Sequence, residues 1–197
     1  MKYLLAVDLE STGLIPNYHE IMQIAIILLD LELNVIAEYN SLVQIQYPER
    51  GYATIIDEQN VFQFAGINPK HLKFAPTMEE VLTQILDLIR NKTKLKNEEL
   101  RHVTLFGQNT KFDMCFLEAA FAKCGIKFYF DYHNVDLVSA FTVYSLVKKN
   151  TLPERLGLHH ICKKLNIINV KEHNAVSDIT TTVSLFKNII QQLKEEK

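Results

Sequence analysis

The sequence lacks the features that mark secreted and membrane proteins. No apolar stretch approaches the length of a membrane span, and acids interrupt the apolar start MKYLLAV too early for a secretory signal. Only three cysteines occur, so they cannot all pair within one chain, and two of them sit in an apolar helical pattern. We therefore expect reduced thiols, a cytoplasmic location and no membrane partner.

An excess of positive charge is also absent. The chain carries a formal net charge of −2, whereas proteins that bind long duplexes through their surface are usually basic. If the substrate is a nucleic acid, we therefore expect it to be short or single-stranded, with metal ions neutralising its phosphates. Local basic stretches occur at residues 92–96, 148–155 and 163–164, and each taken singly is typical of a solvated surface.

Repeats, low-complexity tracts and linkers are absent as well. The length of 197 residues, with 48% hydrophobic and 22% charged residues, fits a single domain over 1–197. An antiparallel meander joined to βα units predicts an α/β domain, with a long connection over 51–76 that contains short helices. Strands are expected at 2–7, 21–29, 35–45, 103–106 and 132–135, and helices at 77–91, 110–124, 137–149, 156–165 and 176–194.

Asp8 and Glu10 lie two residues apart at the carboxyl end of the first expected strand. Their side chains leave the same face about 7 Å apart along the backbone, and two such carboxylates repel each other unless a cation lies between them. They could instead be ordinary acids of a wet edge strand, but the preceding run YLLAV is typical of a strand buried on both faces. The pair therefore indicates a metal site.

Asp113 stands at the head of an apolar helical stripe. Apolar residues follow it at three- and four-residue intervals as far as Cys124, so its side chain is expected to point toward the core. An acid in the first turn is also favoured by the helix dipole, with Asn109 as the N-cap. The residues alone leave both roles open.

His173 and Asp178 are five residues apart, roughly 140° on one continuous helix. The geometry improves if His173 precedes the last helix and Asp178 lies in its first turns. Asp178 would then be held rigidly, whereas His173 on a loop could approach and leave with a substrate. The other six histidines, His19 among them, are expected to be incidental.

Three motifs together resemble the DEDDh superfamily of 3′-to-5′ exonucleases. DLESTG is similar to its first motif, NTKFD to the second and HNAVSD to the third, in order, and the resemblance spans residues 2–186. The tyrosine branch has Tyr where this chain has Asn174, so the chain resembles the histidine branch. Within it, DLESTGL with ELNVIAE is similar to oligoribonucleases, and AGINPKHL to polymerase proofreading subunits. Many relatives have His where this chain has Gln108, which bears on substrate contacts and not on the metal site.

This resemblance implies a ribonuclease H-like fold, a mixed five-stranded sheet flanked by helices, and two Mg²⁺ or Mn²⁺ ions. Asp8 would bridge the ions. Glu10 and Asp178 would hold the ion on the nucleophile side, and Asp113 would support the other. His173 would take the proton from the attacking water, a task that suits a neutral imidazole.

The resemblance also implies a substrate pocket and an activity. Ser11, Thr12 and Leu14 would receive the terminal nucleotide, while Asn109 and Phe112 would line the same pocket, although Phe112 equally suits the core. The expected activity is release of nucleoside 5′-monophosphates from 3′ ends of single-stranded DNA or RNA, or from short oligonucleotides. The alternatives are a polymerase-associated proofreading subunit and a catalytically retired nucleic-acid-binding module. A homodimer is also expected, because many relatives form one.

Overall fold

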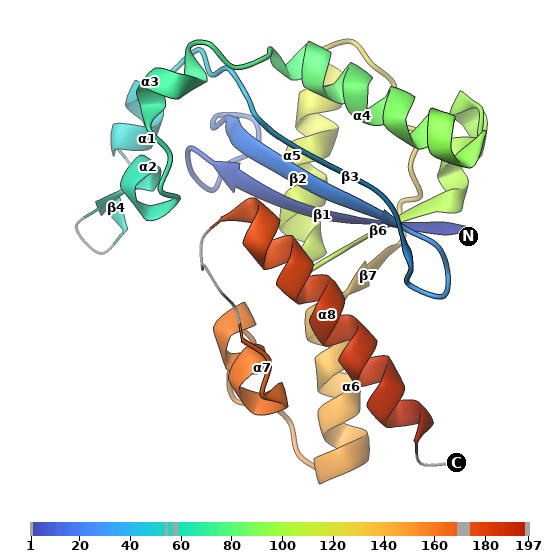
Figure 1. The fold of residues 1–197 in the computed structure, drawn as a ribbon. Coiled ribbons are helices and arrows are strands. Elements are labelled where there is room, and N and C mark those ends of the chain that lie inside the picture. Colours follow the sequence, from blue (N-terminus) through green and yellow to red (C-terminus); the bar gives the residue numbers. More distant parts are fainter. Residues whose placement is uncertain (1, 54, 57–58, 169–173, 196–197) are drawn as a thin grey trace.

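A five-stranded mixed sheet forms the centre of the structure (Figure 1), a computed structural model that describes residues 2–53, 55–56, 59–168 and 174–195. The strand order is β3-β2-β1-β6-β7, with antiparallel pairing among the first three strands and parallel pairing from β1 to β6 and from β6 to β7. The expected fold class is confirmed. The strands are β1 (Tyr3–Ser11), β2 (Ile21–Leu29), β3 (Val35–Leu42), β6 (Val103–Gly107) and β7 (Asn134–Asp136).

Helices cover both faces of this sheet (Figure 1). On one face lie α4 (Met78–Thr93) and α5 (Thr110–Lys123), and on the other lies α8 (Ala175–Lys194), against which α6 (Leu137–Lys149) and α7 (Leu158–Leu165) pack. Shorter elements complete the described chain: α1 (Glu49–Ala53), β4 (Ile55–Ile56), β5 (Gln59–Asn60), α2 (Val61–Phe64), α3 (Pro69–Leu72) and the 3₁₀ helix η1 (Asn97–His102). No helix in these described ranges is both long enough and apolar enough to cross a bilayer.

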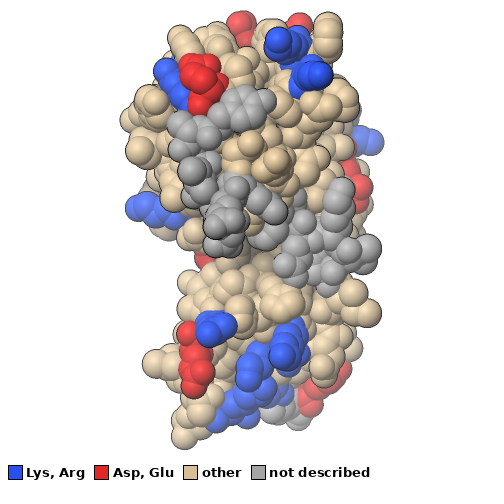
Figure 2. Space-filling model, turned by 90° about the vertical axis from the view of Figure 1, so that its left-hand side faces the viewer, with Lys and Arg blue, Asp and Glu red and all other residues tan. Residues whose placement is uncertain are grey.

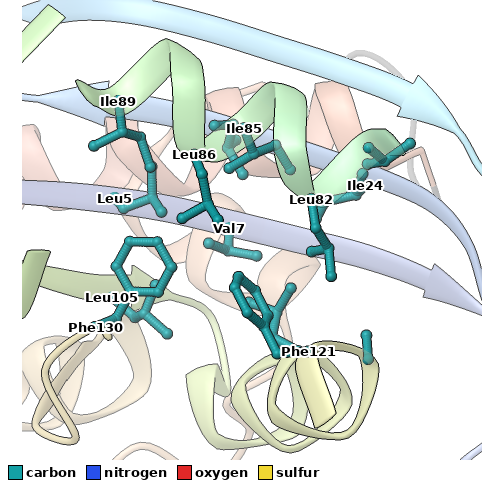
Figure 3. Close-up of a cluster of buried hydrophobic side chains, with 14 of the residues drawn as sticks. Leu5, Val7, Ile24, Leu82, Ile85, Leu86, Ile89, Leu105, Phe121 and Phe130 are labelled. Atoms are coloured by element: carbon teal, nitrogen blue, oxygen red, sulfur yellow. The ribbon is translucent and has the colours of Figure 1, made fainter. Parts of the chain in front are cut away.

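Side chains of β1 alternate between two hydrophobic cores. Leu5 and Val7 point toward α4 and α5, where they meet Leu105 of β6 and Phe121 of α5 (Figure 3). Ala6, between them, points to the opposite face and packs under α8. All nine residues of β2 are buried, because β2 lies inside the sheet and is covered on both faces. This double burial explains its continuous apolar sequence.

Local chemistry fixes several element ends that the sequence pattern placed differently. β1 extends to Ser11 and not to residue 7, because its pairing with β2 continues past the two acids. β3 ends at Leu42, three residues early, since the N–H of Gln44 bonds the Pro76 carbonyl at 2.8 Å. α7 begins at Leu158 and not at 156, because Gly157 has the extended backbone of an N-cap. β7 begins at 134 and not at 132, and η1 occupies part of the expected lysine-rich loop.

Candidate active site

Asp8 and Glu10 lie on the part of β1 that keeps only one neighbouring strand. β1 pairs with β2 as far as Ser11, but its parallel pairing with β6 ends at Ala6 and Phe106. Residues two apart on a strand point the same way, so both carboxylates lie on the face that is covered by α8, as Ala6 does. Their expected common face is confirmed.

The first turn of α8 brings a third carboxylate to this end of β1. The Asn174 side chain accepts the N–H of Ser177 at 3.3 Å, and its carbonyl accepts the N–H of Asp178 at 2.9 Å. Asp178 therefore lies in the first helical turn, as predicted. One carboxylate oxygen from each of Asp8, Glu10 and Asp178 forms a group within 4.8 Å, and all three residues are half-buried.

Asp113 approaches the same point from the opposite layer. It lies in the first turn of α5 and is only 5% exposed, so its predicted inward direction is confirmed. The backbone N–H of Leu9 donates to its carboxylate, which ties the start of α5 to β1 beyond the end of the β1–β6 ladder. Asp113 does not belong to the group within 4.8 Å, but it is close enough to interact electrostatically with Asp8. The site thus draws carboxylates from both layers.

Asp136, at the end of β7, fixes the start of two helices. Its Oδ2 accepts the N–H of Thr110 at 2.7 Å, and its Oδ1 accepts the N–H of Val138 at 2.7 Å. Asn109 occupies the expected N-cap position of α5, but its backbone is left-handed (φ 59°) and its side chain makes no capping bond. The acceptor for α5 therefore comes from Asp136. The sequence signal for it was an acid directly between a strand and an apolar helix.

Replacing Asp136 with alanine is expected to destabilise the protein and to lower its activity. Alanine removes both N-cap bonds, and each lost bond costs about 1 kcal/mol. The melting temperature is therefore expected to fall by about 4 to 8 °C in total. The start of α5 would lose its anchor, so Asp113 would shift and a reaction that depends on its carboxylate would slow by about tenfold or more. Thermal unfolding and initial rates measure both effects. Asp131→Ala, in the same segment but bonded to the exposed His133, serves as the control and is expected to change neither. Equal behaviour of the two variants would contradict the anchoring role.

Burial and mutual repulsion raise the pKa values of the clustered carboxyls. Burial raises the pKa of Glu10 to about 7, with a further contribution from the charge of Asp178. The pKa of Asp113 is also raised, chiefly by burial. The pKa of Asp8 lies well above its ordinary value because of burial first and then of its neighbours Asp113, Glu10 and Asp178. A bound cation would offset this repulsion and favour the ionised carboxylates.

The loop that follows β1 is closed by its own hydrogen bonds. Thr12 is fully buried, its N–H donates to the Glu20 carbonyl at 2.8 Å, and its hydroxyl oxygen accepts the Glu20 N–H at 2.9 Å. The half-buried Ser11 donates its hydroxyl to the Gly13 carbonyl at 2.6 Å, whereas Leu14 is 71% exposed. Among the three residues expected to receive the terminal nucleotide, Leu14 presents its side chain to solvent and Thr12 uses its hydroxyl to close the loop.

His19, expected to be incidental, has a structural role in this loop. Its ring is buried, its Nδ1 accepts the N–H of Ile15 at 3.0 Å, and a Cβ on Gly13 would lie 2.3 Å from the ring. Burial lowers the pKa of His19, which helps to keep the accepting nitrogen unprotonated. The only sequence signal was a histidine six residues after a glycine, which is too weak to predict this packing.

The two residues expected to line the pocket from α5 differ in exposure. Asn109 is exposed, whereas Phe112 is half-buried and lies with its ring centroid 4.9 Å from that of Phe116. Phe112 also packs against the core between the sheet and α4 and α5, as its alternative assignment predicted. Gln108 donates its amide to the Leu156 carbonyl at 3.3 Å, which links the start of α5 to the segment before α7.

His173 lies outside the described residues. Its position before α8 and its role as a base therefore stay predictions from the spacing in HNAVSD. The described chain resumes at Asn174, the N-cap of the helix that carries Asp178.

The three grouped carboxylates fit a small divalent cation. Oxygen ligands bind Mg²⁺ at about 2.1 Å, so oxygens around one ion lie about 3 to 4 Å apart, within the 4.8 Å limit that encloses the group. The donors from Asp8, Glu10 and Asp178 are all carboxylate oxygens, a set that favours Mg²⁺ or Mn²⁺ over zinc.

Comparisons with known proteins agree with this geometry. Residues 5–186 match the model of the exonuclease family RNase_T. Ribonuclease T of Buchnera aphidicola (subspecies Baizongia pistaciae) is 28% identical over 196 residues, which cover 98% of this chain and 85% of that protein. A PolC-type DNA polymerase III of Staphylococcus aureus is 24% identical over 188 residues, which cover 95% of this chain and only 11% of the polymerase.

Solved structures share the fold at lower identity. E. coli exonuclease I in a complex with single-stranded DNA matches with a TM-score of 0.75 and 18% identity over 99% of this chain and 42% of its own. The cell-death related nuclease CRN-4 matches with a TM-score of 0.74 and 15% identity over 98% of this chain and 64% of its own. The chain thus spans less than two thirds of these two nucleases.

Proposed function

Because the chain belongs to the RNase_T exonuclease family, we propose that it is a metal-dependent 3′-to-5′ exonuclease of the histidine branch. Its substrates are the 3′ ends of single-stranded or short nucleic acids, and its products are nucleoside 5′-monophosphates. The entire chain, residues 1–197, acts as one exonuclease domain.

The observation that carries this proposal is the meeting of carboxylates from distant parts of the chain. Asp8 and Glu10 of β1 and Asp178 of α8 place oxygens within 4.8 Å of one another, and Asp113 of α5 interacts with Asp8 from the other side of the sheet. Burial and acidic neighbours raise the pKa values of Asp8, Glu10 and Asp113, so this group of acids is costly to bury without a cation. This cost supports a metal-binding role over a purely structural one.

In the proposed mechanism the four carboxylates would hold two metal ions, and His173 would act as the base. Two Mg²⁺ or Mn²⁺ ions, when bound, would stabilise the attacking and leaving oxygens of an in-line displacement at phosphorus. Asp8 would contact both ions, Glu10 and Asp178 would hold the one beside the attacking water, and Asp113 would support the other. His173 would accept the proton of that water, and its place on the sequence just before α8 suits this role.

Several observations support a single-stranded or short substrate. The net charge of −2 differs from the basic character that is usual for proteins binding long duplexes through their surface, and a structural neighbour, E. coli exonuclease I, is bound to single-stranded DNA. Leu14, exposed in the loop after β1, and Asn109, exposed at the start of α5, are available to a terminal nucleotide. Ser11, Thr12 and Phe112 would shape the same pocket, with Thr12 holding the loop closed.

A second candidate function rests on the similarity to the polymerase. The matched part is a small fraction of the PolC-type enzyme, so the chain could act as a separate proofreading exonuclease that associates with a polymerase. Its preferred substrate would then be a mismatched 3′ end on a primed template. Matched and mismatched primers, compared with free single strands, distinguish the two candidates by relative rate.

Degradation of a 5′-labelled oligonucleotide tests the main proposal. In Mg²⁺ the label is expected to appear in a ladder of products that shorten one nucleotide at a time, and EDTA is expected to stop the reaction. A 3′-terminal phosphate is expected to slow the first cut. Persistence of the full-length strand in Mg²⁺ and in Mn²⁺, with the protein folded by circular dichroism, would reject the exonuclease assignment.

A further inference from the structure

A basic surface lies outside the carboxylate site, on α7 and the segment that joins it to α6. Five lysines and arginines and one acid occur over residues 148–164, a net charge of +4, which leaves −6 for the rest of the chain. Figure 2 shows lysine and arginine side chains gathered on the lower part of the face that carries α7 at the lower left of Figure 1. This basic surface comprises Lys148, Lys149, Arg155, Lys163 and Lys164.

Three of these cations converge on one cavity. Lys149, Arg155 and Lys164 line a hollow of about 410 Å³, with the buried side chains of Phe141 and Ser145 also in its wall. This volume is large enough for a phosphate group and part of a sugar. Independent surface lysines would point away from one another into water, whereas these three surround a single concave space.

The cations of this cavity are not neutralised by carboxylates. Within the described ranges, neither Lys149, Arg155 nor Lys164 forms a salt bridge. Glu154 is the one acid that lines the cavity, so the balance of charge there is positive. Nη1 of Arg155 lies 3.3 Å from Nε2 of His160 in α7. This contact uses one nitrogen of the guanidinium and leaves its other N–H groups for an anion.

The basic surface and the carboxylate site lie on helices that pack against one another. α7 packs against α8, the helix whose first turn carries Asp178, and Figure 1 places α7 below the N-terminal end of α8 on the same side of the molecule. The amide of Gln108, next to the start of α5, also bonds the Leu156 carbonyl just before α7. A strand whose end is held by the carboxylates would run along α7 to reach the cavity, so the shortest substrates would not extend to it.

We propose that the cavity lined by Lys149, Arg155 and Lys164 binds phosphodiester groups of the nucleic-acid strand on the 5′ side of the end that is being cut. The inference rests on the proposed exonuclease function. It explains how an acidic protein retains a polyanionic substrate: five of its cations are collected on α7 and the segment before it, where the uncut strand leaves the metal site. The expected consequence is a dependence of affinity on substrate length.

A triple variant with Lys149→Gln, Arg155→Gln and Lys164→Gln tests this assignment. Binding of a 5′-labelled single strand of roughly 16 nucleotides is followed by fluorescence anisotropy in EDTA, so that the result does not require cleavage. Affinity is expected to fall by about tenfold or more at low salt. The slope of log affinity against log salt is expected to become shallower by about 2, since each phosphate that the protein no longer neutralises changes it by about 0.7. Cleavage of a dinucleotide in Mg²⁺ is expected to keep its wild-type kcat/KM.

A second triple variant controls for the loss of charge alone. Lys92→Gln, Lys94→Asn and Lys96→Gln remove the same charge from exposed positions in the last turn of α4 and just after it, and asparagine suits the left-handed backbone of position 94. This control is expected to bind like wild type. An unchanged salt slope in the first variant, or equal losses in the two variants, would overturn the proposal, as would an equal loss of dinucleotide cleavage. Absence of cleavage by the wild-type protein would instead reject the exonuclease function, and anisotropy would still decide on the basic surface.

Discussion

Replacing Asp8 with asparagine is expected to slow hydrolysis by about a thousandfold or more while leaving the metal-free protein at least as stable as wild type. Asp8 is the one residue whose pKa is raised by all three other carboxylates of the site, Asp113, Glu10 and Asp178, in addition to burial. Asparagine keeps the shape but loses the charge, so an ion would lose its central ligand. The same change removes the repulsion that the metal-free site has to accommodate.

The measurement pairs initial rates in Mg²⁺ with thermal unfolding in EDTA. Glu118→Gln removes an acid of similar size from the exposed side of α5 and is expected to leave both quantities unchanged. Retention of activity in Asp8→Asn would show that this carboxylate is not a metal ligand. A large loss of stability in EDTA would show that Asp8 has a structural role and would remove the repulsion argument.

The concentration of Mg²⁺ needed for half-maximal activity is expected to fall steeply as the pH rises from 5.5 to 7.5. A metal ion binds the ionised carboxylates, and burial holds the pKa of Glu10 at about 7. Each proton that the ion displaces changes its apparent affinity by about tenfold per pH unit. The dependence levels off above the pKa of about 7, so one displaced proton gives about 25-fold over this range. Participation of the raised carboxyl of Asp8 makes the dependence steeper.

The affinity for Mg²⁺ is thus expected to rise with pH, whereas the stability of the metal-free protein is expected to fall. The pKa of Glu10 is higher in the folded protein than its ordinary value of 4.5, so its contribution to stability is present below pH 4.5 and is lost as the pH rises through about 7. In EDTA, Glu10→Gln is expected to remove this part of the pH dependence, whereas saturating Mg²⁺ at pH 8 is expected to raise the melting temperature of wild type. A pH-independent requirement for Mg²⁺, or a variant with the wild-type pH profile of stability, would show that Glu10 does not titrate in this way.

The fold was predictable because its strands and helices have clear periodicities. The unbroken apolar run of β2 and the stripe on α5 each had one consistent interpretation. The structure adds a Thr77–Glu80 capping box at the start of α4. The ends that were wrong depended on contacts from elsewhere in the chain. The N–H of Gln44 leaves the sheet for the Pro76 carbonyl, a partner that no local pattern indicates.

The candidate site was predictable as a set of acids but not as a supported structure. Spacing placed Asp8 and Glu10 on one face and Asp113 toward the core, and the structure agrees. The anchoring by Asp136 was missed because it joins segments that local sequence cannot relate. The packing of His19 on Gly13 was missed because a histidine six residues after a glycine is too weak a signal. The three cations around the α7 cavity had each looked like a separate surface residue, since only the fold brings them together.

The carboxylates that meet at β1 belong to the first strand and the last helix of the chain, and this order bears on when the proposed enzyme can become active. During synthesis Asp8 and Glu10 are made first, and Asp178 is added only with α8. A growing or truncated chain without α8 also lacks the cover over one face of the sheet. Under the proposed function, hydrolysis therefore begins only once α8 has been made, so growing chains that end before α8 do not degrade the nucleic acids around the ribosome.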